Sequence, residues 1–220
     1  MDKLLSDQIE KAQQKWLASW RQGPRRTRWS AVPVQAGDPA PPARLLDHRG
    51  EAVALAELWR DRPALLIFWR HFGCGAGFER AKALRDSWGQ LDDAGVRIAA
   101  IGQGEPERTA WYAERRGLPP AVRFLCDPEG LAYAAYGLLD GLPHQVLFRL
   151  PEPVQRRDFD AGVAVARQRR EAGDPLVDSP WLMPGEFLVD TAGVVRMAHR
   201  YAHIFDIPET ALLLAAVRTL

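Results

Sequence analysis

Cys74 is the side chain whose type and position could do chemistry. An apolar run of strand length at 64–69 leads into the turn Gly73-Cys74-Gly75, and a helical apolar pattern follows over 81–91. This order predicts a buried strand, a tight turn and a helix that begins beside Cys74. Unsatisfied backbone N–H groups and the positive end of the helix dipole both favour the thiolate, the nucleophilic form of cysteine. The alternative is that Cys74 is unreactive and is simply a small residue that fits a crowded strand–helix corner.

Arg70 and His71 directly precede this turn and could add positive charge around the sulfur. Because side chains alternate along a strand, Trp69 and Arg70 are expected on opposite faces, so only some of these side chains can face the thiol. Such a site supports one-thiol chemistry. Cys74 could attack a peroxide to give a sulfenic acid, or a disulfide to give a mixed disulfide, and an external thiol would then restore it.

Cys126 is the second cysteine of the chain. The expected sheet order puts its strand two places from the strand before Cys74. At about 4.8 Å per strand, this separation exceeds the roughly 7 Å limit between the Cα atoms of a disulfide. We therefore expect Cys126 to be a small buried hydrophobic residue, with a resolving cysteine as the alternative.

Other candidate sites lack supporting residues. His199 and His203 are four residues apart, but no carboxylate or cysteine stands at ligand spacing, and the pair His71 and Cys74 has no further ligand. The glycines of 102–104 do not have the form of a phosphate-binding loop. We expect neither a metal nor a cofactor.

Composition describes an ordinary globular chain. Its 220 residues are 47% hydrophobic and 26% charged, with a net charge of +1, so no overall field favours nucleic acid. Two cysteines cannot form a disulfide framework, which fits a reducing compartment. The first residues carry acids and lack the apolar centre of a secretory signal, and no stretch approaches the roughly 20 apolar residues of a membrane span. We expect a cytoplasmic protein, and the excess of Arg over Lys suits a bacterial source.

The first 31 residues read as an extension. Over 3–22, apolar residues recur at three- and four-residue steps and predict an amphipathic helix whose apolar face packs on the domain or on a second subunit. Gly23 and Pro24 end it, and the arginines that follow are expected to form a solvated linker. The apolar positions of the helix are Leu5, Ile9, Ala12, Trp16 and Trp20.

From residue 32 onward, strand and helix patterns alternate. The predicted order is a hairpin at 43–55, the strand before Cys74 and its helix, two further strand–helix units, and a late hairpin and closing helix at 186–220. Alternation of this kind implies parallel βαβ units. Residues 138–181 interrupt it as an inserted segment with a basic helix at 159–171.

This order of elements resembles the redoxin form of the thioredoxin fold, and several phrases resemble the AhpC/TSA (peroxiredoxin) family. The resemblance covers about 32–218 and implies one α/β redoxin domain at 32–220, with a mixed central sheet flanked by helices. It also implies a small peroxide or disulfide substrate and an external thiol reductant. The phrases are Gly37-Asp38-Pro39-Ala40-Pro41, Leu66-Ile67-Phe68-Trp69-Arg70 with Gly73-Cys74, Asp127-Pro128-Glu129-Gly130, and Phe187-Leu188-Val189-Asp190 with Gly193.

Residue by residue, the family's site is matched only in part. Peroxiredoxins carry P-x-x-x-T-x-x-C and an Arg before the late strand. Here Cys74 matches the Cys, whereas Ile67, His71 and Pro184 occupy the Pro, Thr and Arg positions. Pro184 instead matches the cis-proline of thioredoxin-like reductases, so a cis Met183–Pro184 bond is expected. Those reductases use C-x-x-C, and Gly77 stands at its second Cys.

Two functions remain open from the sequence. The first is a monothiol oxidoreductase, with Cys74, His71 and Arg70 as catalytic residues and with Pro184, Gly73, Gly75 and Trp69 positioning the substrate. The second is a redox-inactive binding or assembly module, suggested by the missing Thr, Arg and second Cys and by the added helices. The chain could also form a homodimer.

Overall fold

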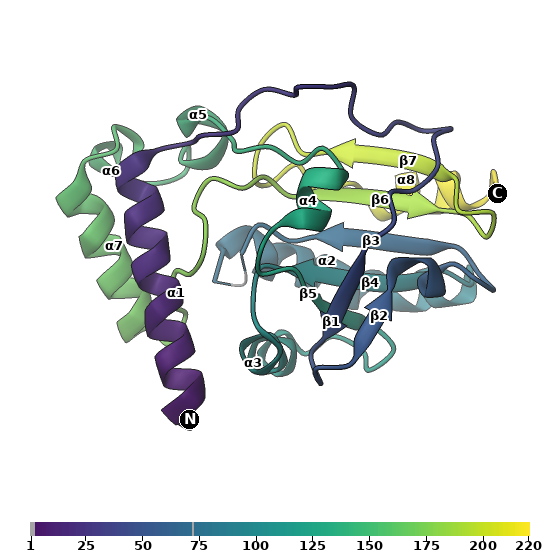
Figure 1. Cartoon of the computed structure of the whole chain (residues 1–220), viewed down its shortest axis with the longest axis horizontal. Coiled ribbons are helices and arrows are strands. Elements are labelled where there is room, and N and C mark those ends of the chain that lie inside the picture. Colours follow the sequence, from purple (N-terminus) through teal and green to yellow (C-terminus); the bar gives the residue numbers. More distant parts are fainter. Residues whose placement is uncertain (1–2, 72) are drawn as a thin grey trace.

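A computed structural model describes residues 3–71 and 73–220. Its centre is a seven-stranded mixed sheet with the order β2-β1-β5-β4-β3-β6-β7 (Figure 1). Strands β3, β4 and β5 are parallel, and the remaining pairings are antiparallel. The strands are β1 (Arg44–Asp47), β2 (Ala52–Ala54), β3 (Ala64–Phe68), β4 (Arg97–Gly102), β5 (Arg123–Cys126), β6 (Gly185–Val189) and β7 (Val195–Arg200).

Helices flank the sheet and form a group at one end of it. The predicted helix at 3–22 and the predicted basic helix at 159–171 are both confirmed with these bounds. The helices are α1 (Lys3–Gln22), the 3-10 helix η1 (Leu55–Leu58), α2 (Gly75–Asp93), α3 (Pro106–Arg116), α4 (Leu131–Ala135), α5 (Pro143–Val146), α6 (Glu152–Gln155), α7 (Phe159–Glu171) and α8 (Thr210–Val217). No helix among the described residues is long and apolar enough to cross a membrane.

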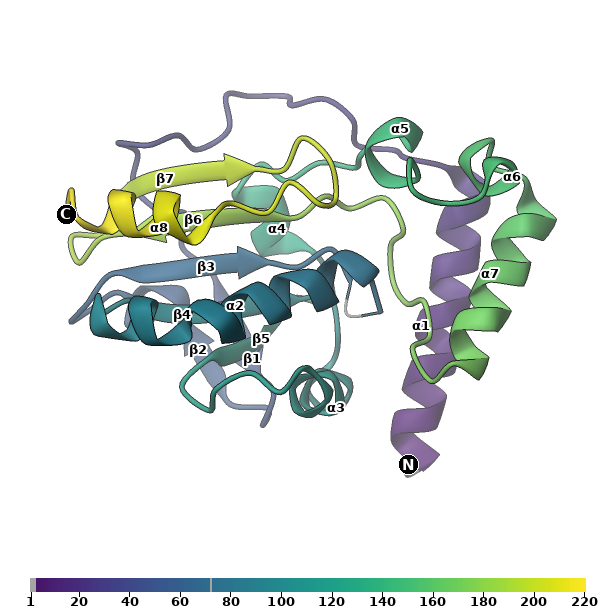
Figure 2. The ribbon, with the colours of Figure 1, turned by 180° about the vertical axis from the view of Figure 1, so that it is seen from behind.

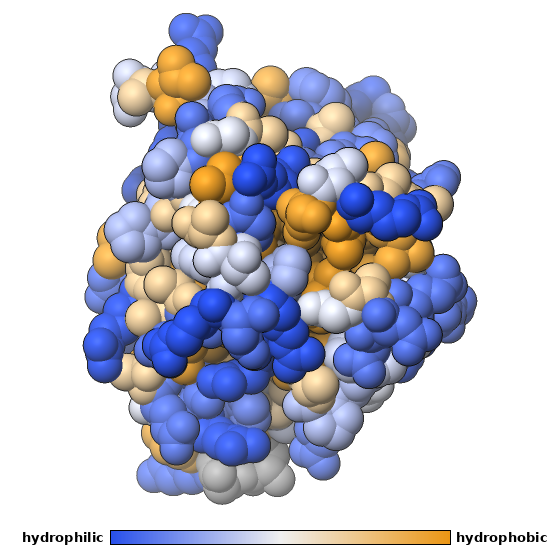
Figure 3. All heavy atoms as spheres, turned by 90° about the vertical axis from the view of Figure 1, so that its right-hand side faces the viewer, coloured by the Kyte–Doolittle hydropathy of each residue, from blue (hydrophilic) through white to orange (hydrophobic). Residues whose placement is uncertain are grey.

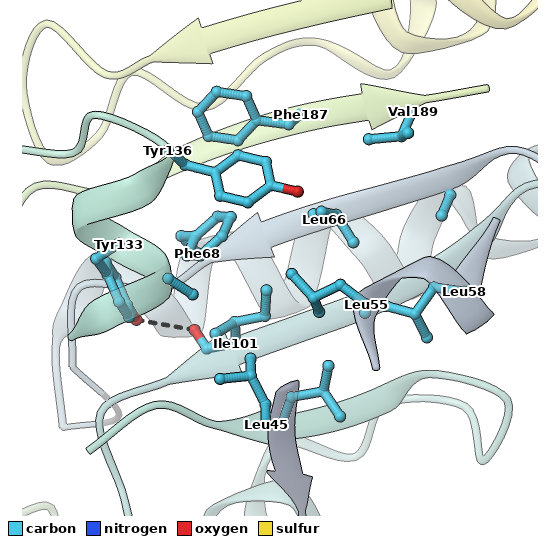
Figure 4. Packing of buried hydrophobic residues seen from close by; sticks show 14 of the residues in the cluster. Leu45, Leu55, Leu58, Leu66, Phe68, Ile101, Tyr133, Tyr136, Phe187 and Val189 are labelled. Atoms are coloured by element: carbon cyan, nitrogen blue, oxygen red, sulfur yellow. Dashed lines mark hydrogen bonds between the residues drawn. The ribbon is translucent and has the colours of Figure 1, made fainter. Parts of the chain in front are cut away.

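Alternation along β3 divides the core between the two faces of the sheet. Leu66 and Phe68 contribute to the core beneath η1 and α4, whereas Leu65 and Ile67 contribute to the core beneath α2, α3 and α8. Figure 4 shows the first of these cores, where the Tyr133 hydroxyl donates to the Ile101 carbonyl at 2.9 Å. Both faces of β3 are therefore buried, as its continuous apolar run predicts.

A third core lies beyond the carboxyl end of β3, where α1 packs against α7 (Figures 1 and 2). All five apolar positions predicted for α1 are buried, so its apolar face packs on the same chain. Trp16, Trp20 and Trp181 form a continuous stack with ring centroids 5.3 Å apart and planes within 6°. Gly162 of α7 allows this packing, because a Cβ there would overlap the Trp20 indole.

The expected cis bond before Pro184 is wrong. No cis peptide occurs among residues 3–71 and 73–220. The chain runs extended from Leu182, which bridges Asp140, through Met183, whose N–H donates to the Leu139 carbonyl at 2.9 Å, and into β6. A trans bond continues this extended path.

The face at the opposite end of the sheet from α1 and α7 is mostly hydrophilic, with a smaller hydrophobic area at its upper right (Figure 3). The carboxyl end of β3, after which the chain leads to Cys74, points away from that face (Figure 1). The chemistry-bearing residues therefore gather at the end covered by the added helices.

Candidate active site

Cys74 lies where β3 turns into α2. Its backbone is extended, with φ −73° and ψ 135°, so it caps the N-terminus of α2. Its N–H donates to the His71 carbonyl at 3.0 Å, and its own carbonyl accepts from the Gly77 N–H at 3.0 Å. The sulfur is thus held beside the first turn of a 19-residue helix, whose end favours negative charge.

Gly73 is required by a close approach of the chain. A Cβ at this position would overlap the Pro175 carbonyl, which follows α7. The Gly73 carbonyl accepts a hydrogen bond from Arg169 Nη2 at 3.1 Å. By contrast, a Cβ on Gly75 would meet no atom within 4 Å. The turn that presents the thiol is therefore held by the inserted segment.

Arg70 reaches the sulfur directly. Its Nη1 donates to Cys74 Sγ at 3.1 Å, and its Nη2 donates to the Pro180 carbonyl. The Arg70 carbonyl accepts from the Gln103 side chain, which fixes the backbone at this point. Arg70 and Cys74 are both buried, at 8% and 4% exposure. A buried guanidinium at this distance stabilises an anionic sulfur by charge and by hydrogen bonding.

His71 does not supply the positive charge that the sequence suggested. Burial, and next the charge of Arg70, hold the pKa of His71 well below its ordinary value, so the ring is neutral at pH 7. Its Nε2 lies 3.4 Å from Arg70 Nη1, and its Nδ1 has no hydrogen-bond partner among the described residues. With Nε2 accepting from Arg70, the neutral ring carries its hydrogen on Nδ1.

A cavity of about 270 Å³ opens onto the thiol. Arg70, His71, Gly73 and Gly75 line it with Cys74, so the structure brings five of the predicted site residues together. The remaining walls come from α1, the first turn of α2, the inserted segment and the loop after β7. They are Trp16, Trp20, Ala76, Val146, Leu147, Arg149, Leu150, Val154, Val165, Arg169, Leu176, Ile204 and Phe205.

Two predicted positioning residues lie outside this lining. Trp69 packs in the core beneath α2, α3 and α8, with its ring 5.8 Å from that of Phe124. Pro184 is buried ahead of β6, and its carbonyl accepts from the Tyr201 N–H at 3.3 Å. Neither residue contributes a wall to the cavity.

Several lining residues escaped the sequence analysis. Arg169 and Val165 are four residues apart on the basic helix, and this spacing places them on one face. That pattern could have marked the face turned toward the thiol. Arg149 and Phe205 carried no comparable signal, because both lie in irregular segments.

Cys126 is remote from this chemistry. The observed order places β4 between β5 and β3, as predicted, so the strand of Cys126 is two places from that of Cys74. Burial raises the pKa of the Cys126 thiol to about 11, and its Sγ lies 3.7 Å from the Asp47 carbonyl. Both cysteines are free thiols. A protonated, buried thiol is a poor nucleophile at neutral pH.

A buried ion pair connects the cysteine helix to the sheet. Arg80 of α2 makes two hydrogen bonds to Glu186 of β6, at 2.7 and 2.8 Å, and the Tyr201 hydroxyl donates to the same carboxylate at 2.5 Å. The two buried side chains of opposite charge neutralise each other. They fix α2, and with it Cys74, against β6.

The paired histidines do not form a cluster. His199 Nε2 lies 2.8 Å from the Asp206 carbonyl, and the exposed His203 ring packs edge-on against Phe148. Within the part of the chain that the structure describes, no three His, Cys, Asp or Glu side chains are grouped as metal ligands.

The sequence matches one protein family and several curated relatives. A sequence model of the AhpC/TSA family matches residues 36–198. The thioredoxin-like protein AAED1 of Arabidopsis thaliana chloroplasts is 31% identical over 45% of this chain and 39% of its own. Peroxiredoxin Bcp of Escherichia coli is 32% identical over 38% of this chain and 53% of its own. The chain thus spans about half the length of these curated relatives.

Solved structures confirm the predicted redoxin fold. Peroxidoxin BcpB from Mycobacterium tuberculosis superposes with a TM-score of 0.59 at 19% identity, covering 85% of this chain and 98% of its own. A thiol peroxidase from Chromobacterium violaceum gives 0.57 at 18% identity, covering 86% and 89%.

Proposed function

Because this chain belongs to the AhpC/TSA family, we propose that it is a thiol-dependent peroxidase with Cys74 as its single nucleophile. The observation that carries the proposal is the hydrogen bond from buried Arg70 to Cys74 Sγ at 3.1 Å, at a helix N-terminus that faces a cavity. These features favour an anionic sulfur in contact with a small molecule.

The reaction is a two-electron transfer from sulfur to a peroxide. The Cys74 thiolate attacks one peroxide oxygen, the O–O bond breaks, and an S–O bond forms to give the sulfenic acid. The other oxygen leaves with the bonding pair and takes a proton from solvent, giving water or an alcohol. The same thiolate could instead attack a disulfide, releasing one thiolate and forming a mixed disulfide.

We expect Arg70 and His71 to perform the roles that Thr and Arg have in the family's site. The Arg70 guanidinium stabilises the thiolate through its 3.1 Å hydrogen bond. We expect the Nδ1–H of His71, which stands at the family's Thr position and has no partner among the described residues, to donate a hydrogen bond to the leaving oxygen as charge develops on it. A neutral ring suits this donor role, because a charged His71 would compete with Arg70.

Restoring the thiol takes an external reductant. A first thiol attacks the sulfenic acid, releasing water and forming a mixed disulfide, and a second thiol then releases Cys74 as a free thiol with a new disulfide. Cys126 does not substitute for the first thiol, because its strand is two places away and its thiol is protonated.

Mass spectrometry after dilute peroxide tests the proposal. We expect Cys74 to gain one oxygen, Cys126 to stay reduced, and added dithiothreitol to remove the oxygen and sustain peroxide consumption. Cys74→Ser should abolish turnover, while Cys126→Ala should leave it within about twofold. A Cys74 that stays reduced, with no peroxide- or disulfide-dependent turnover, would contradict the proposal.

The alternative, a redox-inactive binding module, loses one of its supports. It relied on an amphipathic N-terminal helix that could serve a partner. The apolar face of α1 is buried against α7 and Trp181, so it is not available as a docking surface. The same peroxide experiment separates the two functions, since a binding module would leave both cysteines unmodified.

A further inference from the structure

The cavity above Cys74 is far larger than hydrogen peroxide requires. Its volume is about 270 Å³, whereas about 10–15 Å³ on the same measure is enough to hold one water molecule. Most of its walls are aliphatic or aromatic, with Trp16 and Trp20 from α1 and Leu150 and Val165 from the inserted segment. Water molecules find few hydrogen-bond partners on such walls. An apolar group that is buried against them is stabilised by the hydrophobic effect.

The charged groups that line the cavity are all positive. Of the residues that the structure describes, Arg70, Arg149 and Arg169 line it, and no Asp or Glu does. His71 is neutral, so it neither adds to nor offsets this charge. Low-dielectric walls strengthen the field of the three guanidinium groups inside the cavity.

Arg149 differs from the other two arginines because, among the described residues, it makes no hydrogen bond to the turn that carries Cys74. Arg70 donates to Sγ and Arg169 donates to the Gly73 carbonyl, whereas Arg149 is exposed and has no carboxylate partner among residues 3–71 and 73–220. Its guanidinium lies 4.1 Å above the Phe205 ring, which holds it at the edge of the cavity. It therefore stands where it can pair with an anionic group outside the apolar walls.

We propose that this cavity binds an amphipathic organic anion, with its apolar body against the walls of α1 and the inserted segment and its carboxylate at Arg149. The binding of this anion does not depend on the proposed peroxidase function.

Calorimetric titration of the Cys74→Ser protein with octanoate and with octanol tests the binding without redox chemistry. Octanoate should bind more tightly than octanol. Arg149→Glu should weaken octanoate binding by about fourfold or more, as expected for reversing one exposed charge, and leave octanol unchanged. Arg167→Glu on the exposed side of α7 changes the net charge equally and should have no effect.

A second pair of variants tests the apolar wall. Val165 lines the cavity, whereas Val163 on the same helix is exposed and does not. Val165→Gln should weaken both ligands severalfold, and Val163→Gln should weaken neither. Equal affinity for octanoate and octanol, or an Arg149→Glu protein that matches Arg167→Glu, would overturn the proposal.

Turnover distinguishes this inference from the proposed function. Octanoate binding without turnover of any peroxide would refute the peroxidase but uphold the anion site. Turnover of hydrogen peroxide without octanoate binding would uphold the peroxidase and refute the anion site.

Discussion

Replacing Arg70 by methionine tests whether its guanidinium makes Cys74 reactive. Methionine keeps much of the length of the side chain but removes the charge and the donor that lies 3.1 Å from Sγ. The Pro180 carbonyl also loses its donor. We therefore expect the free energy of unfolding to fall by about 1 kcal/mol, the usual contribution of one hydrogen bond.

The effect on rate follows from the lost stabilisation of the sulfur anion. A hydrogen bond to a charged group contributes about 1.5–3 kcal/mol, and each 1.4 kcal/mol is about tenfold. The anion would thus become about 10- to 150-fold less favourable. A less stabilised sulfur anion is also a better nucleophile. With a Brønsted coefficient of about 0.5, this gain cancels about half of the loss on a logarithmic scale. The net expectation is a reaction about 3- to 12-fold slower at pH 7.

The assay is the rate of Cys74 alkylation by iodoacetamide at pH 7, followed by mass spectrometry. Arg167→Met serves as the control, because it removes one positive charge from the exposed side of α7. Arg70→Lys, which keeps the charge without the planar fork, should give an intermediate rate. A folded Arg70→Met protein that alkylates as fast as the unmodified chain would refute the reasoning.

Three further changes have defined outcomes. Glu186→Gln should lower the free energy of unfolding in urea by about 3–5 kcal/mol, because the buried Arg80 loses its charged partner. Gly73→Ala should destabilise by about 1–3 kcal/mol and slow Cys74 alkylation, whereas Gly75→Ala, which meets no atom within 4 Å, should change neither in thermal melts and alkylation assays. The pKa of His71 lies well below that of an unfolded histidine, so below about pH 6.5 the unfolded chain binds a proton that the folded chain does not. Stability should fall there by up to about 1.4 kcal/mol per pH unit, and urea unfolding at pH 7.5 and 5.5 should show a smaller fall in His71→Gln.

Local periodicity predicted the elements well. The three- and four-residue spacing in α1 identified its buried face correctly, because a helix turns through a fixed angle per residue. Gly117 is a comparable local signal, because α3 ends there with the left-handed φ of 56° that suits glycine. Such signals come from residues within one or two helical turns of one another, so they do not depend on contacts with distant parts of the chain.

Tertiary contacts supplied what the sequence could not. Arg169 supports the cysteine turn from far along the chain, and no local pattern specifies that contact. The neutral state of His71 depends on burial, which its neighbours in sequence do not determine. The isomer before Pro184 likewise depends on the strand that it enters.

The stack of Trp16, Trp20 and Trp181 gives the protein an optical reporter beside its sulfur. Three indoles at 5.3 Å with nearly parallel planes share their electronic transitions, and they belong to the same core as Cys74. Circular dichroism near 225 nm will therefore contain an exciton signal that depends on the spacing of the rings. Any movement of α1 that admits a molecule to the cavity will change this spectrum, so events at the thiol can be followed without a label.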